Sequence, residues 1–573
     1  MPTKIKIAVY ANCDDVLIAW RIDKAIKSCW GFALEREMKD ATGTTSGFVT
    51  NRTGFRSRPG KPGEQRPSNE WPFQRFSWTD HKVNTGDTVR YRVSAVMTDQ
   101  DGGVELDATQ RSDWTPWLTL TGQIDKTLEV YFNRGTVMSQ FAGRYLQKFQ
   151  QEIGEPDFDK ALRAFKNRLA QHDAPIRLFL GGELRRKVID VLDSAKKKGQ
   201  HVFAALYELE DEELIQHLSA LKGKAHVVLA NGSVKTKGGD QNAAGRKKLK
   251  QAGVDVVDRM VCTGAGGPLG HNKFLVVCNS AKKALSAWTG SLNWTKTGLC
   301  TQINNGILIH HAPIADEYLQ QYHRLAGAGN AFPKPLVAAN SKPKSISVAG
   351  KRWDVWFTRA SSKVDLAALD AEVEGAKDAI LFLMFMPGPT ATLKTIRDMA
   401  RKHPKLYVHG VATQLPKDDQ KTADVETLGT SGVHRAHLKI VQTEGIKNPF
   451  AAWTAEVTRN EFKGNIGNAI IHSKLVVIDP FTNPVVITGS HNFSNSASGK
   501  NDENFVIIRG HRALAEAYAA HIIAMYHHYR WRAHVAAKQA ANKQAWGGLE
   551  ESDGWQMGHL KGASLREIEF WCP

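Results

Sequence analysis

Two hydrophobic patterns divide the chain. Up to residue 122, apolar and polar residues alternate in short runs that are separated by turns rich in Pro, Gly, Asn and Asp. Alternation with a period of two predicts β-strands with one buried face, and several short strands joined by such turns are typical of a β-sandwich. The predicted strands are residues 4–10, 16–22, 31–37, 73–78, 88–97 and 117–120.

One of these strands resembles part of a known module. Residues 84–96 read Asn-Thr-Gly-Asp-Thr-Val-Arg-Tyr-Arg-Val-Ser-Ala-Val, which is similar to the penultimate strand of fibronectin type III modules. The match places Tyr91 at the position of the tyrosine corner, a tyrosine whose hydroxyl bonds the backbone upstream. Trp20, on an early predicted strand, would then fill the core between the sheets. The resemblance covers residues 1–122.

Beyond residue 122 the pattern changes and then repeats. Helical periodicity alternates with apolar runs, which predicts an α/β domain of layered helices and strands. The predicted strands at 128–134, 201–207 and 225–230 have counterparts at 353–359, 379–385 and 405–411, and the amphipathic helix at 183–198 has one at 366–376. Repetition over this length indicates a duplicated domain and not a solenoid, whose repeats are much shorter.

The predicted fold class is therefore α/β, with two duplicated lobes that follow an all-β sandwich. A Pro-, Ser- and Lys-rich stretch at 331–347 is predicted to link the lobes, and a long helix at 512–546 to close the second lobe. The predicted domains are the sandwich at 1–122, the lobes at 123–335 and 336–546, and a C-terminal tail at 547–573.

Each lobe ends in the same set of polar residues. A histidine and a lysine two positions apart begin an apolar β-run, so alternation points both side chains to one face. A Gly-Ser-x-Asn segment follows, in which glycine lets the backbone approach closely while serine and asparagine offer short polar side chains. The residues are His271, Lys273, Ser291 and Asn293 in the first lobe and His472, Lys474, Ser490 and Asn492 in the second.

Cleavage of a phosphodiester needs this combination of side chains. The reaction requires a nucleophile, a proton donor for the leaving oxygen, and positive charge around the developing negative charge. A neutral imidazole can attack phosphorus, and a second, protonated imidazole can supply the proton and then activate water. The lysines, serines and asparagines can hold the non-bridging oxygens. The motifs therefore predict a reaction that needs neither a metal ion nor another cofactor.

The doubled pattern of H-x-K with a downstream G-S-x-N resembles the phospholipase D superfamily over residues 123–546. The resemblance implies lobes packed face to face, with His271 and His472 at one phosphorus atom in a monomer that forms an internal pseudo-dimer. The family aspartate, a structural residue, is present as Asp479 but is replaced by Cys278 in the first lobe. A catalytic thiol is the alternative for Cys278, but strand alternation turns that residue away from His271.

A second asymmetry lies downstream of each motif, where Asn304 in the first lobe matches Glu503 in the second. In the family, an acid at this position orients the catalytic histidine of the opposite lobe. Carried over, Glu503 would fix the tautomer of His271 and stabilise its charged form, while Asn304 would give His472 a neutral partner. The resemblance thus implies that His271 is the nucleophile and His472 the general acid and base. The alternative for Glu503 is a solvated charge at a strand end.

Composition limits the class of protein. The chain has 573 residues, of which 42% are hydrophobic and 23% charged, as in soluble globular proteins with more than one domain. Six cysteines without metal-ligand spacing argue against a disulfide framework and a zinc site. The N-terminus lacks a secretory pattern, and the longest apolar run, 379–387, is too short to span a membrane. We therefore expect a cytoplasmic protein without an integral membrane segment, and export without a signal stays open.

The net charge of +18 favours an anionic partner but does not choose among phospholipid, nucleic acid and other phosphodiesters. Two motifs in one chain are, by the resemblance, typical of lipid enzymes, which hydrolyse or transfer headgroups and contact membranes peripherally. The charge favours a nuclease instead. A non-catalytic binding protein is the third hypothesis, and the completeness of both motifs argues against it. A basic stretch before the first motif either binds a polyanion or is solvated; its residues are Lys235, Lys237, Arg246, Lys247, Lys248 and Lys250.

Two further residues stand at the ends of the repeated strands 201–207 and 379–385, namely Tyr207 and Met386. Packing in the core is the default interpretation for both, and lining the pocket is the alternative.

Overall fold

The computed structural model describes residues 4–40, 43–61, 64–98, 103–135, 149, 151–155, 158–388, 392–413, 438–442, 471–540 and 547–573. The chain forms two compact units, one of Met1–Gly122 with Ala537–Pro573 and one of Gln123–Ala536. None of the described helices combines the length and the apolar composition needed to cross a membrane.

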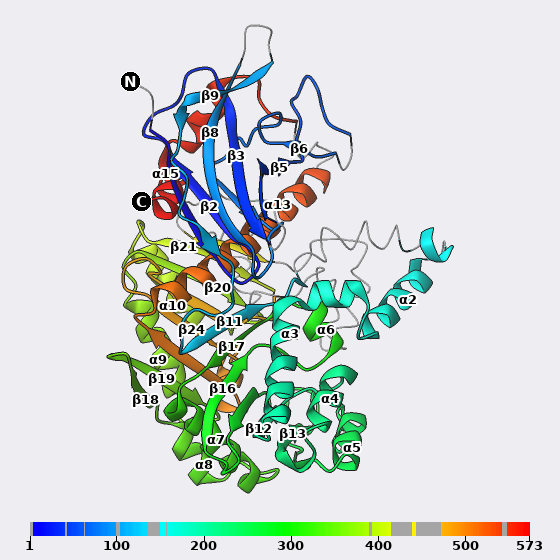
Figure 1. Ribbon diagram of the computed structural model, residues 1–573. Coiled ribbons are helices and arrows are strands. Elements are labelled where there is room, and N and C mark those ends of the chain that lie inside the picture. The colour runs from blue at the N-terminus through cyan, green and yellow to red at the C-terminus, as the bar shows by residue number, and fades with distance from the viewer. Residues whose placement is uncertain are drawn as a thin grey trace. The chain divides into compact units, whose positions relative to one another are not determined.

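The first unit contains two sheets that share one core (Figure 1). Its strands are β1 (Lys6–Ala11), β2 (Val16–Arg21), β3 (Cys29–Asp40), β4 (Gly43–Phe48), β5 (Thr50–Asn51), β6 (Arg66–Pro67), β7 (Ser77–Asp80), β8 (Thr88–Thr98), β9 (Val104–Arg111) and β10 (Leu118–Thr119). One sheet has the order β1-β2-β7 and the other β10-β8-β3-β4, with β9 paired to β8; β5 and β6 form a separate pair. Trp20 on β2 and Phe32 on β3 meet in the core. The all-β prediction is confirmed.

The resemblance of this unit to fibronectin type III modules stays a prediction. Tyr91 on β8 is fully buried. Its hydroxyl donates to the carboxylate of Asp80 at 3.1 Å, whereas a tyrosine corner bonds the backbone. Asp80 also pairs with Arg36 on β3 at 2.7 Å, so the tyrosine belongs to a buried polar group that bridges the two sheets.

Residues 547–573 complete the core of the first unit. Their helices are η3 (Asp553–Trp555), α14 (Gln556–His559) and α15 (Gly562–Trp571). The Trp555 ring packs edge-on against Phe32, with 5.7 Å between ring centroids, and its indole N–H donates to the Cys29 carbonyl at 3.0 Å. The predicted tail is therefore part of the same compact unit as the sandwich.

We expect Trp555→Ala to destabilise the first unit by about 3–5 kcal/mol, because it removes a large buried ring from the core. Hydrogen exchange of β3 and β8 amides in the full chain would measure the change. Met557→Ala is the control, since Met557 is 59% exposed on the same segment. Equal protection of β3 and β8 in both variants would contradict the expectation.

The second unit contains two sheets that repeat one strand order (Figure 1). The first lobe has β11 (Leu128–Phe132), β12 (His201–Leu206), β13 (Ala225–Ala230), β14 (Asp255–Arg259), β15 (Lys273–Cys278), β16 (Ala284–Gly290) and β17 (Asn305–Ile309). The second has β18 (Lys344–Val348), β19 (Lys351–Phe357), β20 (Ala379–Met384), β21 (Tyr407–Ala412), β22 (Leu438–Gln442), β23 (Leu475–Ile478), β24 (Val485–Gly489) and β25 (Asn504–Arg509). The orders are β11-β17-β16-β15-β12-β13-β14 and β18-β19-β25-β24-β23-β20-β21-β22. Apart from β18 the two orders correspond strand for strand, which confirms the duplication.

Helices cover these sheets. Figure 1 shows α4 and α5 beside β13 in the first lobe. The helices of the first lobe are α2 (Phe158–Ala170), α3 (Pro175–Lys197), α4 (Glu212–Ser219), η2 (Lys222–Lys224), α5 (Ala243–Gln251), α6 (Lys296–Cys300) and α7 (Ala312–Ala328). Those that follow are α8 (Lys334–Asn340), α9 (Val364–Glu374), α10 (Thr392–Lys402), α12 (Asn495–Gly499) and α13 (Arg512–Ala540). The end of the predicted long helix, 541–546, lies outside the described residues.

The prediction of a linker at 331–347 was wrong. The stretch contains α8 and the edge strand β18, which pairs antiparallel with β19. In β18 the side chains alternate: Ser345 and Ser347 are exposed, whereas Ile346 is half-buried and Val348 is buried. The polar residues that suggested a linker are therefore the solvent face of an edge strand.

Candidate active site

Both histidine–lysine pairs lie at the same end of their sheets, where the inner strands β15 and β23 begin. β15 runs antiparallel to β12, so Lys273 at the start of β15 lies opposite Leu206 at the end of β12. β23 and β20 pair in the same way, with Leu475 opposite Leu383. The buried motif side chains at these strand ends are His271, Lys273, Ser291, Asn293, His472, Lys474 and Ser490, and Asn492 is half-buried.

The glycine of each motif allows a close approach between strands. A Cβ atom on Gly290 would lie 2.3 Å from the Asn305 carbonyl oxygen, and one on Gly489 would lie 2.3 Å from the Asn504 carbonyl oxygen. Real Cβ atoms do not come so close, so these positions require glycine. The close approach lets the N–H of the next residue, Ser291 in the first lobe, donate to Asn305 at 3.0 Å.

The second lobe supplies the partner of the histidine in the first. Nδ1 of His271 lies 2.7 Å from Oε2 of Glu503. The Ser490 hydroxyl donates to the same oxygen at 2.8 Å, and the Asn501 amide donates to the other oxygen at 3.2 Å. Glu503 is fully buried and is therefore not a solvated charge.

The first lobe likewise supplies the partner of the histidine in the second. We call each of these contacts between lobes a crossing, and this one has the same geometry but a neutral partner. Nδ1 of His472 lies 2.9 Å from Oδ1 of Asn304 and 3.0 Å from the Ser291 carbonyl oxygen. The Ser291 hydroxyl donates to Asn304 Oδ1 at 2.7 Å, as Ser490 does to Glu503. Glu503 with Ser490, and Asn304 with Ser291, thus form two hydrogen-bonded pairs of the same geometry, of which only the first carries a charge.

These partners assign the tautomers. A carboxylate and a carbonyl oxygen only accept, so Nδ1 carries the proton in both rings and Nε2 is left free. Burial, and secondarily the lysine charges, lowers the pKa of His271 to about 4 although Glu503 opposes the shift. Burial, Lys474 and Lys273 hold the pKa of His472 well below its ordinary value. These shifts favour the neutral form of both imidazoles near pH 7.

The two lysines are held in equivalent ways. Nζ of Lys273 donates to the His271 carbonyl at 2.8 Å, and Nζ of Lys474 donates to the His472 carbonyl. Burial lowers the pKa of Lys273 to about 7, and it lowers that of Lys474 well below the usual range. The charge of Glu503 opposes both shifts. A bound phosphate anion would oppose them further, so the lysines are suited to hold one.

Aromatic rings line the site from the ends of β12 and β20. The ring of Tyr207 packs edge-on against His271, with 4.6 Å between centroids, and that of Phe385 packs against His472 at 5.1 Å. The ammonium groups of Lys273 and Lys474 lie 4.9 and 5.1 Å from the same two rings. Tyr207 therefore lines the site, and the residue that lines it from the second lobe is Phe385 and not Met386.

One site residue was not predicted. Nδ2 of Asn293 donates to Oε2 of Glu208 at 2.7 Å, and the charge of Glu208 also acts on Lys273 and Lys474. Glu208 directly follows Tyr207 at the end of β12. An acidic residue at the end of a buried strand is a signal by which Glu208 could have been predicted. The second lobe has Met386 at the matching position, so Glu208 is not part of the repeated motif.

Further hydrogen bonds hold the lobes together around the histidines. Thr289 donates to Oδ1 of Asn504 at 2.6 Å, and Asn305 donates to the Thr488 hydroxyl at 2.9 Å. Each bond therefore joins a threonine of one lobe to an asparagine of the other. These positions come directly before the Gly-Ser-x-Asn motif and directly after Asn304 or Glu503, so they fix the crossing.

A buried ion pair lies beside the same crossing. Arg259 at the end of β14 bonds both carboxylate oxygens of Asp502, at 2.8 and 3.1 Å. The N–H of Asp502 also donates to the Leu269 carbonyl at 2.8 Å. Leu269, two residues before His271, and Asp502, next to Glu503, are thus bonded across the lobes independently of the contact between His271 and Glu503.

The structure explains why one lobe has Cys278 where the other has Asp479. The Asp479 carboxylate accepts three backbone N–H groups of the loop before β20, at 2.7 to 2.9 Å. In the first lobe the matching loop turns at Gly199, which has a φ of +65°. The N–H groups of Gly199 and Gln200 bond carbonyls of α3 at 3.1 and 2.9 Å, so the loop needs no carboxylate. Burial raises the pKa of Cys278 to about 12, and a reactive thiolate is not expected.

We expect Asp479→Ala to lower the local stability of β20 by about 3 kcal/mol, because it leaves backbone N–H groups without an acceptor. Cys278→Ala is the matched variant and should cost about 1 kcal/mol in β12. Hydrogen exchange of peptides from the two strands would measure both. Equal losses would mean that the carboxylate has no special structural role.

Half of the basic stretch before the first motif is neutralised within the lobe. Arg246 pairs with Asp240 and Asp258, at 2.9 and 2.6 Å. Lys248 and Lys250 also pair with acidic residues of this lobe. These three therefore offer little charge to a polyanion. The remaining basic residues are Lys235, Lys237 and Lys247.

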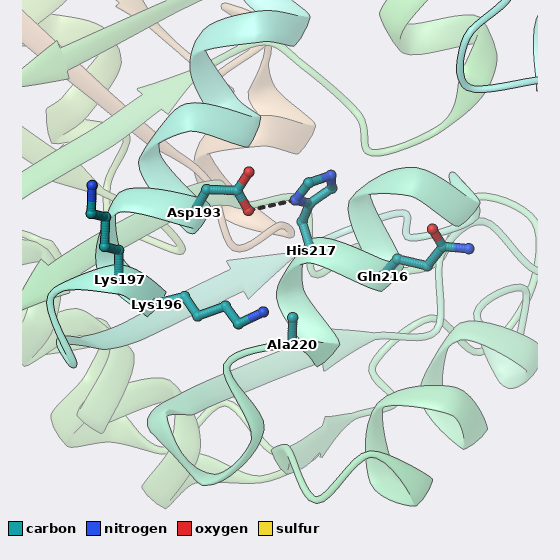
Figure 2. Close-up of a pocket in the computed structure, with 6 residues that line it drawn as sticks. All are labelled: Asp193, Lys196, Lys197, Gln216, His217 and Ala220. Carbon is teal, nitrogen blue, oxygen red and sulfur yellow. Dashed lines mark hydrogen bonds and ion pairs between the residues drawn. The ribbon is translucent and has the colours of Figure 1, made fainter.

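A surface hollow between α3 and α4 is separate from this chemistry (Figure 2). Nδ1 of His217 lies 2.6 Å from a carboxylate oxygen of Asp193, and two lysines of α3 flank the pair. None of the motif residues lines the hollow; its lining is Asp193, Lys196, Lys197, Gln216, His217 and Ala220. Among the described residues, no group of three His, Cys, Asp or Glu side chains is placed to hold a metal ion.

The sequence match to a known family agrees with the two lobes. The family model described as "Cardiolipin synthase, PLD-like domain" matches residues 188–326 and 372–526, more than half of the chain. The chain belongs to the phospholipase D superfamily. The predicted resemblance is confirmed, and the protein is an enzyme of the phosphodiesterase type. No curated protein matches the sequence.

Three solved structures align with this superfamily member at low identity. Polyphosphate kinase from Porphyromonas gingivalis is 11% identical with a TM-score of 0.37, over 56% of this chain and 42% of its own. Phosphatidylserine synthase from Haemophilus influenzae is 10% identical with a TM-score of 0.40, over 60% and 85%. The phospholipase D family member Nuc from Salmonella typhimurium is 21% identical with a TM-score of 0.21, over 26% and 91%. All three scores are low, so the assignment rests on the sequence match.

Proposed function

We propose that the protein is a metal-independent phosphodiesterase that acts through a phosphohistidine on His271. The observation that carries the proposal is the buried contact of 2.7 Å between Glu503 and Nδ1 of His271. The carboxylate keeps the proton on Nδ1 and points the free Nε2 away from Glu503. It also stabilises the positive charge that the ring gains when Nε2 is phosphorylated. His472 has a neutral partner and is suited to release its proton.

The proposed reaction has two steps. In the first, Nε2 of His271 bonds to phosphorus as the bond to the leaving oxygen breaks, and His472 gives that oxygen its proton. In the second, His472 takes a proton from water, the water oxygen bonds to phosphorus, and the bond to His271 breaks. An alcohol in place of water gives transfer instead of hydrolysis. The two lysines stabilise the charge on the non-bridging oxygens in both steps.

The substrate must help to protonate His472. Burial and, after it, the charges of both lysines lower the pKa of its imidazole. A phosphodiester between the lysines and the histidine carries a negative charge, which stabilises the imidazolium and offsets the lysines. Proton uptake by His472 is therefore coupled to substrate binding.

Trapping the intermediate tests the proposed roles. With a labelled diester that has a 4-nitrophenyl leaving group, His472→Ala should accumulate label on His271, because this leaving group needs no acid and the variant lacks the base for the second step. Mass spectrometry of acid-quenched protein would locate the label. Label on His472 in the His271→Ala variant would overturn the assignment. Glu503→Gln should slow label formation about 100-fold, because the orienting carboxylate is lost.

We propose phospholipid headgroup esters as the substrates, with hydrolysis or transfer as the reaction. The family description names cardiolipin synthase, and both motifs lie in one chain, which supports a lipid substrate. Such a substrate requires peripheral contact with a membrane surface. A nuclease is the second candidate, and the net charge of +18 favours it. The neutralised residues of the basic stretch weaken that candidate.

A parallel assay in EDTA separates the candidates. We expect release of headgroup from phospholipid vesicles by the full chain, with no cleavage of single-stranded DNA, double-stranded DNA or RNA. The His271→Ala variant is the control for contaminating activity. DNA or RNA cleavage without headgroup release would replace the lipid proposal by the nuclease. Loss of all activity in EDTA would contradict the metal-independent mechanism.

A further inference from the structure

Glu208 gives the site a carboxylate beyond the one that orients His271. Its Oε2 accepts from Nδ2 of Asn293 at 2.7 Å. Asn293 is a residue of the Gly-Ser-x-Asn motif and is 5% exposed, while Glu208 is half-buried, so the carboxylate lies directly beside the motif. Its charge acts on both Lys273 and Lys474, one from each lobe.

The matching part of the second lobe is different. The position of Glu208 is occupied by Met386, which has no charge. Among the described residues, Oδ1 of Asn492, which corresponds to Asn293, has no hydrogen-bond partner, and its Nδ2 donates no hydrogen bond. An amide donor is therefore open to a phosphate oxygen in the second lobe, while the first lobe has committed its donor to Glu208.

The charges around a bound phosphate follow from these contacts. With a phosphate anion bound, which favours the charged form of both lysines, the ammonium groups of Lys273 and Lys474 are matched in number by the carboxylates of Glu503 and Glu208, whose charges oppose the lowering of the lysine pKa values. Protonated His472 adds one positive charge. A phosphodiester, which is a monoanion, neutralises that charge, but a phosphomonoester carries a second negative charge near neutral pH and leaves the site with an excess. In a buried site an unmatched charge is costly.

We propose that Glu208 is the residue that makes the site select monoanionic phosphodiesters over dianionic phosphates. This inference rests on the proposed function, because its purpose is to discriminate a diester substrate from a monoester. Hydrolysis of a diester yields a phosphomonoester, so the same carboxylate repels the product. Glu208 therefore serves both substrate choice and product release.

Binding of two simple anions to the full chain tests the proposal. Sulfate is a dianion at every pH near neutrality and dimethyl phosphate is a monoanion. We expect Glu208→Gln to tighten sulfate binding about tenfold relative to dimethyl phosphate binding at pH 6. The carboxylate repels the second negative charge of sulfate, which dimethyl phosphate lacks, and the substitution removes that repulsion. Calorimetric titration would measure both dissociation constants. Their ratio cancels any change in lysine protonation that affects both anions equally.

Glu210→Gln is the matched control. Glu210 lies two residues further along the chain and accepts from Nε2 of Gln241 at 3.0 Å. Its ratio of dissociation constants should equal that of the unaltered protein. An unchanged ratio in Glu208→Gln, an equal change in Glu210→Gln, or failure of both anions to bind would overturn the proposal.

Diester turnover distinguishes this failure from that of the proposed function. If the unaltered protein cleaves diesters but Glu208→Gln leaves the binding ratio unchanged, only the role of Glu208 is wrong. If the ratio changes as expected but no diester is cleaved, the charge selection stands and the phosphodiesterase proposal falls.

Discussion

The buried contact between Glu503 and His271 constrains the rest of the second unit. A carboxylate that is removed from water costs several kcal/mol unless charged or polar groups surround it. Here Ser490, Asn501 and His271 provide those groups, and the Thr358 hydroxyl accepts the N–H of Glu503 at 3.0 Å. Because acid and histidine come from different lobes, the contact exists only while the lobes keep their register. The buried pair of Arg259 and Asp502 and the threonine–asparagine bonds maintain that register.

Only one of the two crossings carries a charge, and the proposed chemistry explains why. A nucleophilic histidine becomes positively charged in the intermediate and gains from a fixed carboxylate throughout. A general acid must hold its proton and then release it, which a carboxylate partner would hinder by stabilising the imidazolium. Asn304 orients His472 through the same atom, Nδ1, without that effect. The geometric requirement is shared by both halves, whereas the electrostatic requirement differs.

The sequence allowed most of the fold and the motif residues to be predicted, because both follow from local patterns. Alternation places His271 and Lys273 on one face whatever lies beyond the strand. Glu208 was missed because the second lobe has Met386 at the matching position, and the pair of Arg259 and Asp502 was missed because its two residues are 243 positions apart in sequence. The edge strand β18 was missed for a different reason. Its exposed face consists of Ser345 and Ser347, and such polar residues do not distinguish a solvated strand from a linker.

Comparison of the lobes separates structural from chemical constraints. Thr289 and Thr488 hold the lobes together through equivalent bonds, and both copies keep threonine there. Where a residue sets the charge at one phosphorus atom, a two-fold arrangement would be a disadvantage, since a carboxylate in both positions would repel the substrate. The copies differ at Glu503 and at Glu208, each in one lobe only. A duplicated fold can thus supply an asymmetric site: the backbone repeats the geometry, and two carboxylates, each present in one lobe only, make the halves differ in charge.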